Sequence, residues 1–169
     1  GGVARRRATE ERSEGIAEGD RTIRKIPERD DERSAMHKKE EVWMMQMVPR
    51  LTLDDARLMM KAAEAKAREI GIDMDIAITD DAGCLLMFHR MDNARITSID
   101  IAISKAFTAA AARKSTRAYG ETSQPGGPSF GIHVSHQGRF MIVAGGLPVF
   151  HEGRIVGGIG CSSGHADQD

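Results

Sequence analysis

Residues 73–91 restrict the possible folds more than any other stretch of the chain. DMDIAIT alternates between polar and apolar residues as a short strand does, DDAG supplies a turn, and CLLMFHRM continues as a second strand. Two strands joined by so short a turn pair in an antiparallel manner. Because helical patterns precede and follow this hairpin, the sequence predicts the α+β class, with helices laid against an antiparallel sheet.

Two helices are predicted around the hairpin. The first begins at Thr52, which forms a capping-box pattern with Asp55, and it ends at Gly71, a residue suited to a left-handed stop. The second is predicted over residues 97–119 and opens with the same capping spacing. After a loop we expect three further strands, at residues 131–135, 139–146 and 148–161, the last bent by a turn at Glu152 and Gly153.

The N-terminal part has a different character. Residues 1–41 are nearly free of apolar side chains and carry eleven basic and eleven acidic ones. Such a segment cannot bury enough surface to offset its ordering entropy. We therefore divide the chain into a charged extension, residues 1–48, and a domain, residues 49–169. The extension is interpreted as a disordered or weakly helical tail, as sequence upstream of the natural start, or as an oligomer-facing arm, because EVWMMQMV at its end is apolar.

The overall composition excludes several classes of partner. The net charge of −1 and the pI of about 6.7 give no reason to expect nucleic acid or an anionic membrane as a partner. No apolar run reaches the roughly 18 residues that a membrane-spanning helix needs. Two cysteines, Cys84 and Cys161, make neither a disulfide framework nor a zinc site, which favours a reducing compartment. We expect a cytoplasmic protein.

Several motifs together resemble one known family. In order and spacing, the chain resembles the GlcG/HbpS-like family, also called the haem-degrading domain family, from Leu51 to Asp167; the motifs are LTLDDARLMMKAAEAKAREIGI, ITDDAGCLLMFHRMDNARITSIDIAISKAFTAA, QPGGPSFGI, AGGLPV and GRIVGGIGCSSG. The family includes the C-terminal domain of PduO-type proteins. The resemblance implies a profilin-like fold with α/β/α layers and a five-stranded antiparallel sheet. It also implies homo-oligomers, from dimers to octamers, and a small-molecule ligand, which is haem in some members.

A charged trio and a lysine are the first candidates for a site. Arg90 and Asp92 lie two residues apart at a predicted strand end, so they share one face, with Met91 between them as a soft contact for haem. They form either a surface ion pair or a site in which Arg90 binds a carboxylate and Asp92 accepts a proton. Lys105 falls on the apolar side of its helix. It either extends to the rim or is desolvated, with a lowered pKa suited to acid/base work.

Glycine loops and one histidine complete the set. The loops PGGP, AGG and GGIGCSSG are interpreted either as tight turns or as nests of backbone amides for a carboxylate or haem propionate, formed by Gly126, Gly127, Gly145, Gly146 and Ser162. No histidine pair has the spacing of a zinc site. His165 follows the last of these loops, where the family has a residue that cannot ligate metal, and it is a candidate haem iron ligand or general acid/base. His133 is expected within a strand.

Three functional hypotheses remain open. The first is a homo-oligomer that binds haem or a related small ligand in a cleft near subunit interfaces; the low aromatic content, 4%, favours an interface pocket over a deep one. The second is a cofactor-independent enzyme on a small carboxylate, with Lys105 and Asp92 as acid/base groups, Arg90 and the glycine amides as anchors, and His165 assisting. The third is an accessory protein that binds its partner through the N-terminal extension.

Overall fold

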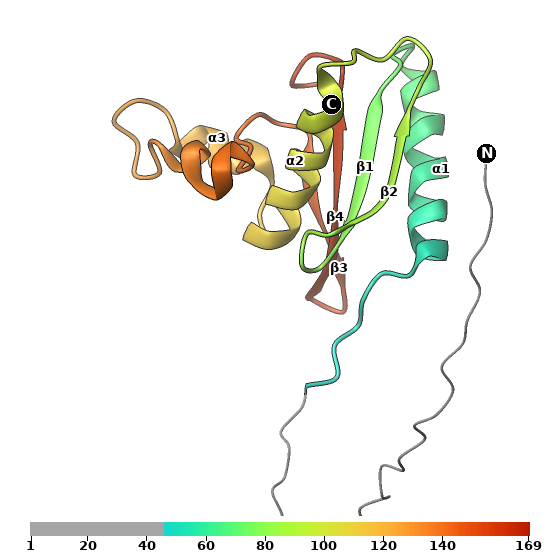
Figure 1. Cartoon of the computed structure of the whole chain (residues 1–169), viewed down its shortest axis with the longest axis horizontal. Helices are drawn as coiled ribbons and strands as arrows, with labels where there is room; N and C mark the ends of the chain where they lie inside the picture. The colour runs from blue at the N-terminus through green and yellow to red at the C-terminus, as the bar shows by residue number, and fades with distance from the viewer. Residues whose placement is uncertain (1–45) are drawn as a thin grey trace, which may run out of the picture. The chain divides into compact units, whose positions relative to one another are not determined.

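A computed structural model of the protein describes residues 46–169, and Figure 1 shows their arrangement. In chain order the elements are α1 (Leu53–Glu69), β1 (Asp75–Asp80), β2 (Leu85–Arg90), α2 (Ser98–Ala112), α3 (Thr116–Thr122), the 3₁₀ helix η2 (Ile132–Gly138), β3 (Gly146–His151) and β4 (Arg154–Ser162). None of the helices in this part of the chain is long and apolar enough to cross a membrane. Nearly all of the predicted N-terminal extension lies outside the described residues, so its interpretations stay predictions.

The sheet confirms the α+β class. Its strands follow the order β2-β1-β4-β3, and all three neighbouring pairs are antiparallel. The predicted hairpin is β1–β2, and a second hairpin joins β3 to β4. The turn of the second hairpin is at Glu152 and Gly153, as predicted, with φ values of 47° and 75°. Two successive residues with positive φ are what a two-residue turn between twisted strands requires.

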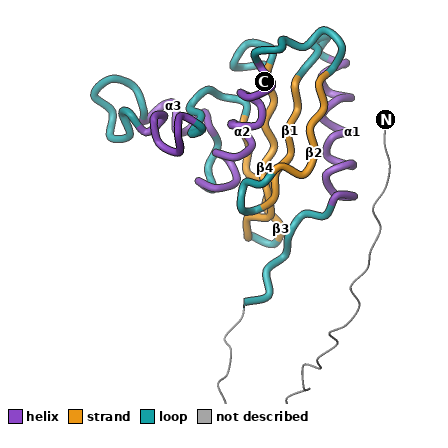
Figure 2. The backbone as a smooth tube through the Cα atoms, viewed as in Figure 1, coloured by secondary structure: helices purple, strands orange, loops and turns teal. Residues whose placement is uncertain are grey.

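The two faces of the sheet pack against different helices, which gives three layers (Figures 1 and 2). Ile76 and Ile78 point to one face and join the core with Ala56 and Met60 of α1. Ala77, the residue between them, points to the other face and packs with α2. This alternation follows from the two-residue period of a strand. It places α1 and α2 on opposite sides of the sheet.

Glycines in β4 let α2 approach the sheet backbone closely. A Cβ atom added at Gly160 would lie 2.2 Å from the carbonyl oxygen of Ala102, and one at Gly158 would lie 2.4 Å from that of Ala106. No side chain fits in such a space. Close packing of α2 along the strand therefore explains the GGIGC pattern. The sequence alone had also allowed a nest of backbone amides there.

The predicted second helix is broken into two. Arg113 adopts a left-handed conformation, with a φ of 55°, and ends α2, while the Ser115 side chain caps α3 by accepting from the amide of Ala118 at 3.3 Å. The capping box predicted at Thr97 is also wrong, because Thr97 is itself helical and its side chain makes no capping hydrogen bond. The capping box at Thr52 is confirmed in both directions.

Two of the predicted strands are absent from the described residues. Residues 132–138 form η2, and residues 139–145 have no regular secondary structure. The predicted last strand, residues 148–161, is divided by its turn into β3 and β4, so the sheet has four strands where five were expected. His136 and Gln137 have φ values of 52° and 59°, which no strand tolerates. The apolar residues of this region line a pocket instead.

Candidate functional site

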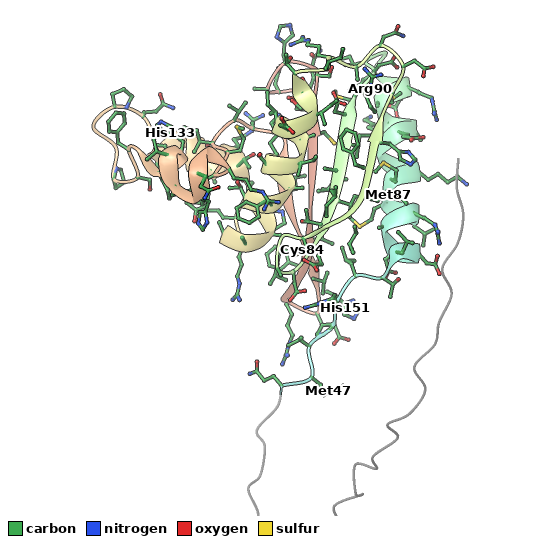
Figure 3. The ribbon with its side chains drawn as sticks, in the orientation of Figure 1. Met47, Cys84, Met87, Arg90, His133 and His151 are labelled. Carbon is green, nitrogen blue, oxygen red and sulfur yellow. The ribbon has the colours of Figure 1, made fainter. Side chains whose placement is uncertain are left out.

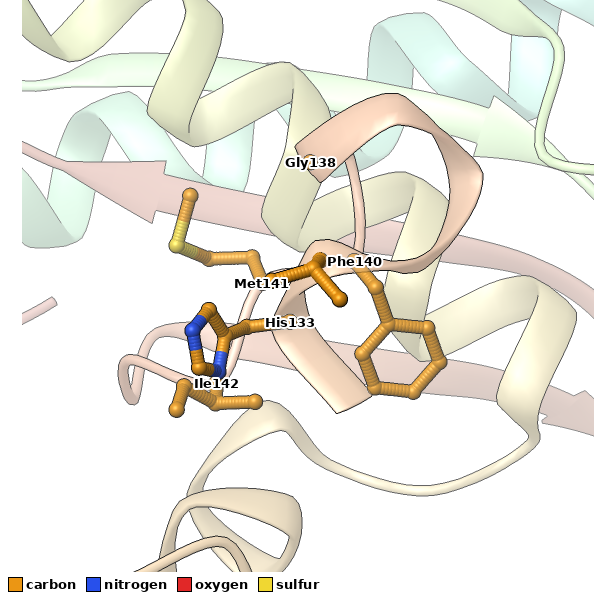
Figure 4. Close-up of a pocket in the computed structure, with 6 residues that line it drawn as sticks. His133, Gly138, Phe140, Met141 and Ile142 are labelled. Carbon is orange, nitrogen blue, oxygen red and sulfur yellow. The ribbon is translucent and has the colours of Figure 1, made fainter. Parts of the chain in front are cut away.

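An apolar pocket lies beside η2. It has a volume of about 520 Å³ and is lined by His133, Val134, Gly138, Phe140, Met141 and Ile142. His133 and Val134 are exposed, whereas Phe140 is buried. Figure 4 shows the His133 ring between the side chains of Met141 and Ile142, with Phe140 pointing the other way. The pocket therefore offers one imidazole and one thioether within a hydrophobic wall.

A cluster of aromatic rings supports the pocket from behind. The ring of Phe140 meets Tyr119 of α3 edge to face, with centroids 4.9 Å apart, and stacks on His136 at 6.3 Å. His136 in turn meets Phe107 of α2 at 5.6 Å, and the Arg139 guanidinium lies 4.0 Å from the centroid of Phe107. Such ring pairs prefer these offset geometries and hold each other in place. The pocket is thereby fixed to two helices.

The backbone of η2 is strained next to the pocket. His136 and Gln137 are consecutive non-glycine residues in the left-handed region. This conformation costs roughly 1–2 kcal/mol per residue for an L-amino acid. Strain of this kind persists only where surrounding contacts impose it, and it concentrates at functional sites. Here His136 supplies those contacts, because its ring meets Phe107 edge to face and stacks on Phe140.

Arg90, Met91 and Asp92 lie together in a different, smaller pocket. It has a volume of about 250 Å³ and is also lined by Glu64, Arg68, Asp73 and His89. The hydrogen bond from His89 lowers the pKa of the Glu64 carboxyl, more than burial raises it. The structure thus brings the charged trio into one polar pocket. Figure 3 shows Arg90 and His133 in separate parts of the molecule.

Lys105 is fully buried on the α2 side of β4. Its ammonium group donates to the carbonyl oxygen of Cys161 at 2.8 Å and to the Asp169 carboxylate at 2.7 Å. Burial, with the Asp169 charge as the second cause, raises the pKa of the Cys161 thiol to about 11. Lys105 neither reaches the rim nor lines the pocket of Arg90 and Asp92, so the lysine and the charged trio do not face one common cleft.

The predicted glycine nests do not gather at one place. Gly126 adopts a φ of 82° in an exposed turn, and the amide of Gly127 donates to Gln124 within that turn. The amide of Gly146 donates to the Thr116 hydroxyl at 2.9 Å. Gly145 lies against Lys105, because a Cβ added there would be 2.7 Å from its Nζ atom. The amides of Gly127 and Gly146 are thus occupied by intramolecular acceptors.

The remaining predicted residues lie apart from the apolar pocket. Ser162 is buried in β4, paired in register with Asp75 of β1. His165 is exposed, and its amide donates to the Gln168 side chain at 3.0 Å. Within residues 46–169, no three His, Cys, Asp or Glu side chains converge as they would around a metal ion. These residues therefore contain no cluster of side chains that could bind a metal ion without a cofactor.

Sequence reasoning missed two features. The pocket beside η2 was hidden because residues 131–146 were predicted as strands, which made His133 a sheet residue. Asp75 does lie in a strand, as predicted, but its burial was not predicted. Both of its carboxylate oxygens are buried without a hydrogen-bond partner among the described residues. Burial raises the pKa of Asp75, and the Arg90 charge opposes that rise. A charged residue in the alternating pattern DMDIAIT was the only signal.

The chain is similar in sequence and in fold to several known proteins. Residues 51–169 match the model of a family described as haem degrading protein HbpS-like. An uncharacterized 15.0 kDa protein from the dhaT-dhaS intergenic region of Citrobacter freundii is 39% identical over 124 residues, 73% of this chain and 87% of that protein. Protein ORFY of Klebsiella pneumoniae has a solved structure with a TM-score of 0.72 and 34% identity, covering 74% of this chain and 86% of ORFY. A solved PduOC–haem complex has a TM-score of 0.68 and 28% identity, covering 70% of this chain and 86% of that one.

Proposed function

Because the chain belongs to the HbpS-like family of haem degrading proteins, we propose that it binds haem, and that the site is the apolar pocket beside η2. The observation that carries this assignment is the presence of His133 and Met141 in one hydrophobic pocket. Nitrogen of histidine and sulfur of methionine are both common axial ligands of haem iron. The PduOC structure, solved as a haem complex, supports the ligand.

The residues of the pocket fit the demands of a porphyrin. Haem brings four nitrogen donors of its own, so the protein need supply only one or two axial ligands and an apolar wall. Val134, Phe140 and Ile142 provide that wall, and a volume of about 520 Å³ lies in the usual range for small-molecule sites. When bound, haem supplies one-electron and oxygen chemistry. The chain's own part is to hold the iron through His133 and to exclude water from the porphyrin faces.

We further propose that a second copy of the chain completes the site. Apolar side chains around the pocket are exposed: Phe130 by 63%, Val134 by 71% and Val143 by 47%. A cluster of exposed apolar side chains beside a pocket is typical of an interaction surface. Covering them with another subunit would bury the open side of the haem. This arrangement corresponds to a homo-oligomer with its ligand near a subunit interface.

A hemin titration of single-histidine variants tests the axial ligand. The wild type is expected to show a saturable Soret band at one haem per chain. His133→Ala should weaken binding by roughly tenfold or more, equivalent to about 1.4 kcal/mol. His165→Ala tests the residue that the sequence analysis named as a candidate iron ligand, and His151→Ala, on the exposed end of β3, is the control. Neither substitution should change the affinity.

Three outcomes would contradict the proposal. A slowly saturating spectrum without defined stoichiometry would mean adsorption. Unchanged affinity in His133→Ala would remove His133 as the ligand. If His165→Ala alone weakened binding, the iron would be held at the exposed turn after β4, outside the apolar pocket.

A further inference from the structure

The buried ammonium group of Lys105 faces a carboxylate from the segment 164–169. We propose that Lys105 and the backbone amide of Gly164 form a binding subsite for one small carboxylate, and that the Asp169 side chain is its resident ligand in this structure. The subsite is separate from the haem pocket and does not depend on it. Its ligand class is a monocarboxylate of the size of formate or acetate, because the side chain of aspartate is a methylene group joined to a carboxylate.

The geometry of the contact is that of a carboxylate receptor. One oxygen of Asp169 accepts from the Lys105 ammonium at 2.7 Å, and the other accepts from the amide of Gly164 at 2.7 Å. The ammonium also donates to the Cys161 carbonyl at 2.8 Å, which fixes its direction. Two donors that address the two oxygens separately recognise a carboxylate by charge and by shape.

The subsite is also shaped for a small group. Lys105 has no exposed surface, and the Asp169 side chain is only 5% exposed. Gly145, with a φ of 116°, leaves room beside them: a Cβ at this position would lie 2.7 Å from Lys105 Nζ and 2.7 Å from the Cβ of Asp169. Removing the Asp169 side chain would therefore leave an acetate-sized space next to an uncompensated buried charge, which strongly favours the entry of an anion.

The segment that carries Asp169 makes few other hydrogen bonds with the rest of the described domain. Residues 165–168 are exposed, and the amides of Gln168 and Asp169 donate back to His165 within the segment. Apart from the hydrogen bonds of Gly164 and Asp169, the segment is joined to the described remainder of the domain by the Arg117 guanidinium, which donates to the carbonyl of Ala166 at 3.0 Å. The carboxylate contact is thus the main polar anchor of the segment.

Chemical rescue tests the subsite. In the 169-residue chain, Asp169→Gly should lower the melting temperature in chloride buffer, and formate or acetate at equal ionic strength should restore it in a saturable manner. Butyrate, which is too large for the space, should not. Isothermal titration of Asp169→Gly with acetate should give one site per chain. Asp167→Gly, which removes an exposed carboxylate from the same segment, is the matched control and should show no response to acetate.

The double variant Lys105→Met/Asp169→Gly separates this site from general anion effects. The proposal requires that acetate have no specific effect on the double variant. It is overturned if acetate stabilises the double variant as much as Asp169→Gly, or if neither formate nor acetate stabilises or binds Asp169→Gly. Should Asp169→Gly fail to fold in chloride, the yield on refolding with and without formate is measured instead. A yield that formate raises only when Lys105 is present supports the subsite, and a yield that formate does not raise overturns it.

Discussion

Asp75 is a buried carboxyl group whose surroundings do not compensate its charge. It lies in β1 with no exposed surface, and neither oxygen has a hydrogen-bond partner among residues 46–169. Burial raises its pKa above the ordinary value of 3.8, against the attraction of Arg90. The folded state therefore holds this proton more tightly than the unfolded chain does. Stability from this group is present at low pH and is lost as the pH rises through the folded-state pKa.

Replacing Asp75 by asparagine should remove that pH dependence. Asp75→Asn has nearly the same shape but cannot ionise, so it should match the wild type near pH 4 and be more stable at pH 7. We expect the gain to increase with pH, because each unit by which burial raises the folded-state pKa of Asp75 costs about 1.4 kcal/mol once the carboxyl is ionised. Urea denaturation at several pH values measures the difference. A gain that is constant across this range would contradict the assignment.

The two thiols should differ sharply in reactivity. Cys84 is exposed, whereas burial and the neighbouring Asp169 carboxylate raise the pKa of Cys161 to about 11. Because the thiolate is the nucleophile, iodoacetamide at pH 8 should modify Cys84 rapidly and leave Cys161 unmodified in the folded protein. Peptide mass spectrometry identifies the labelled site. Fast labelling of Cys161 would mean that its surroundings are open to solvent.

Single residues could be predicted from the sequence only as far as local patterns reach. The helical spacing placed Lys105 on the apolar side of its helix, and the structure buries it there completely. Its partner could not be predicted, because Asp169 lies 64 residues away in the sequence and meets Lys105 only through the packing of α2 against β4. The same limit applies to Arg90 and Asp92, whose pocket is completed by residues of α1.

At the scale of elements, the two threonines predicted as caps provide a direct comparison. The Thr52 hydroxyl accepts from the amide of Asp55 at 3.2 Å, and the Asp55 carboxylate accepts from the amide of Thr52 at 2.9 Å. Thr97 makes no such bond. Thr52→Ala should therefore cost about 1 kcal/mol of unfolding free energy, while Thr97→Ala should change it little. Equal losses in urea denaturation would show that capping is not the cause.

Elements were predicted well where a strong local signal marks both ends. Helix α1 has its capping box and Gly71, and the β1–β2 hairpin has its turn, so both were correct. The turn at Glu152 and Gly153 was also correct, but it was expected to bend one strand, and it instead separates the paired strands β3 and β4. The segment after α2 was predicted incorrectly, because the run of alanines before Arg113 contains no signal for a left-handed residue. The apolar residues between 132 and 142 resemble strand residues in composition. Their conformation is decided by tertiary contacts with Phe107 and Tyr119, which override propensity.

At the scale of the whole molecule, we expect self-association through the surface beside the pocket. Phe130 is 63% exposed there without lining the pocket itself. Phe130→Glu should shift the protein toward monomer, because burying a charge at an interface is unfavourable. Leu58→Glu, at a 70% exposed position on α1, is the matched control and should leave the oligomer intact. Size-exclusion chromatography with light scattering measures both. A monomeric wild type would refute the interface.

Hydrogen exchange with and without hemin shows whether haem occupies the pocket beside η2. Exchange reports the local opening of backbone hydrogen bonds, which a bound ligand suppresses. Bound hemin should slow exchange in peptides covering residues 132–142 and leave the pocket around Arg90 unchanged. Protection that instead centres on residues 89–92 or on the segment around His165, with none in residues 132–142, would place haem outside this pocket.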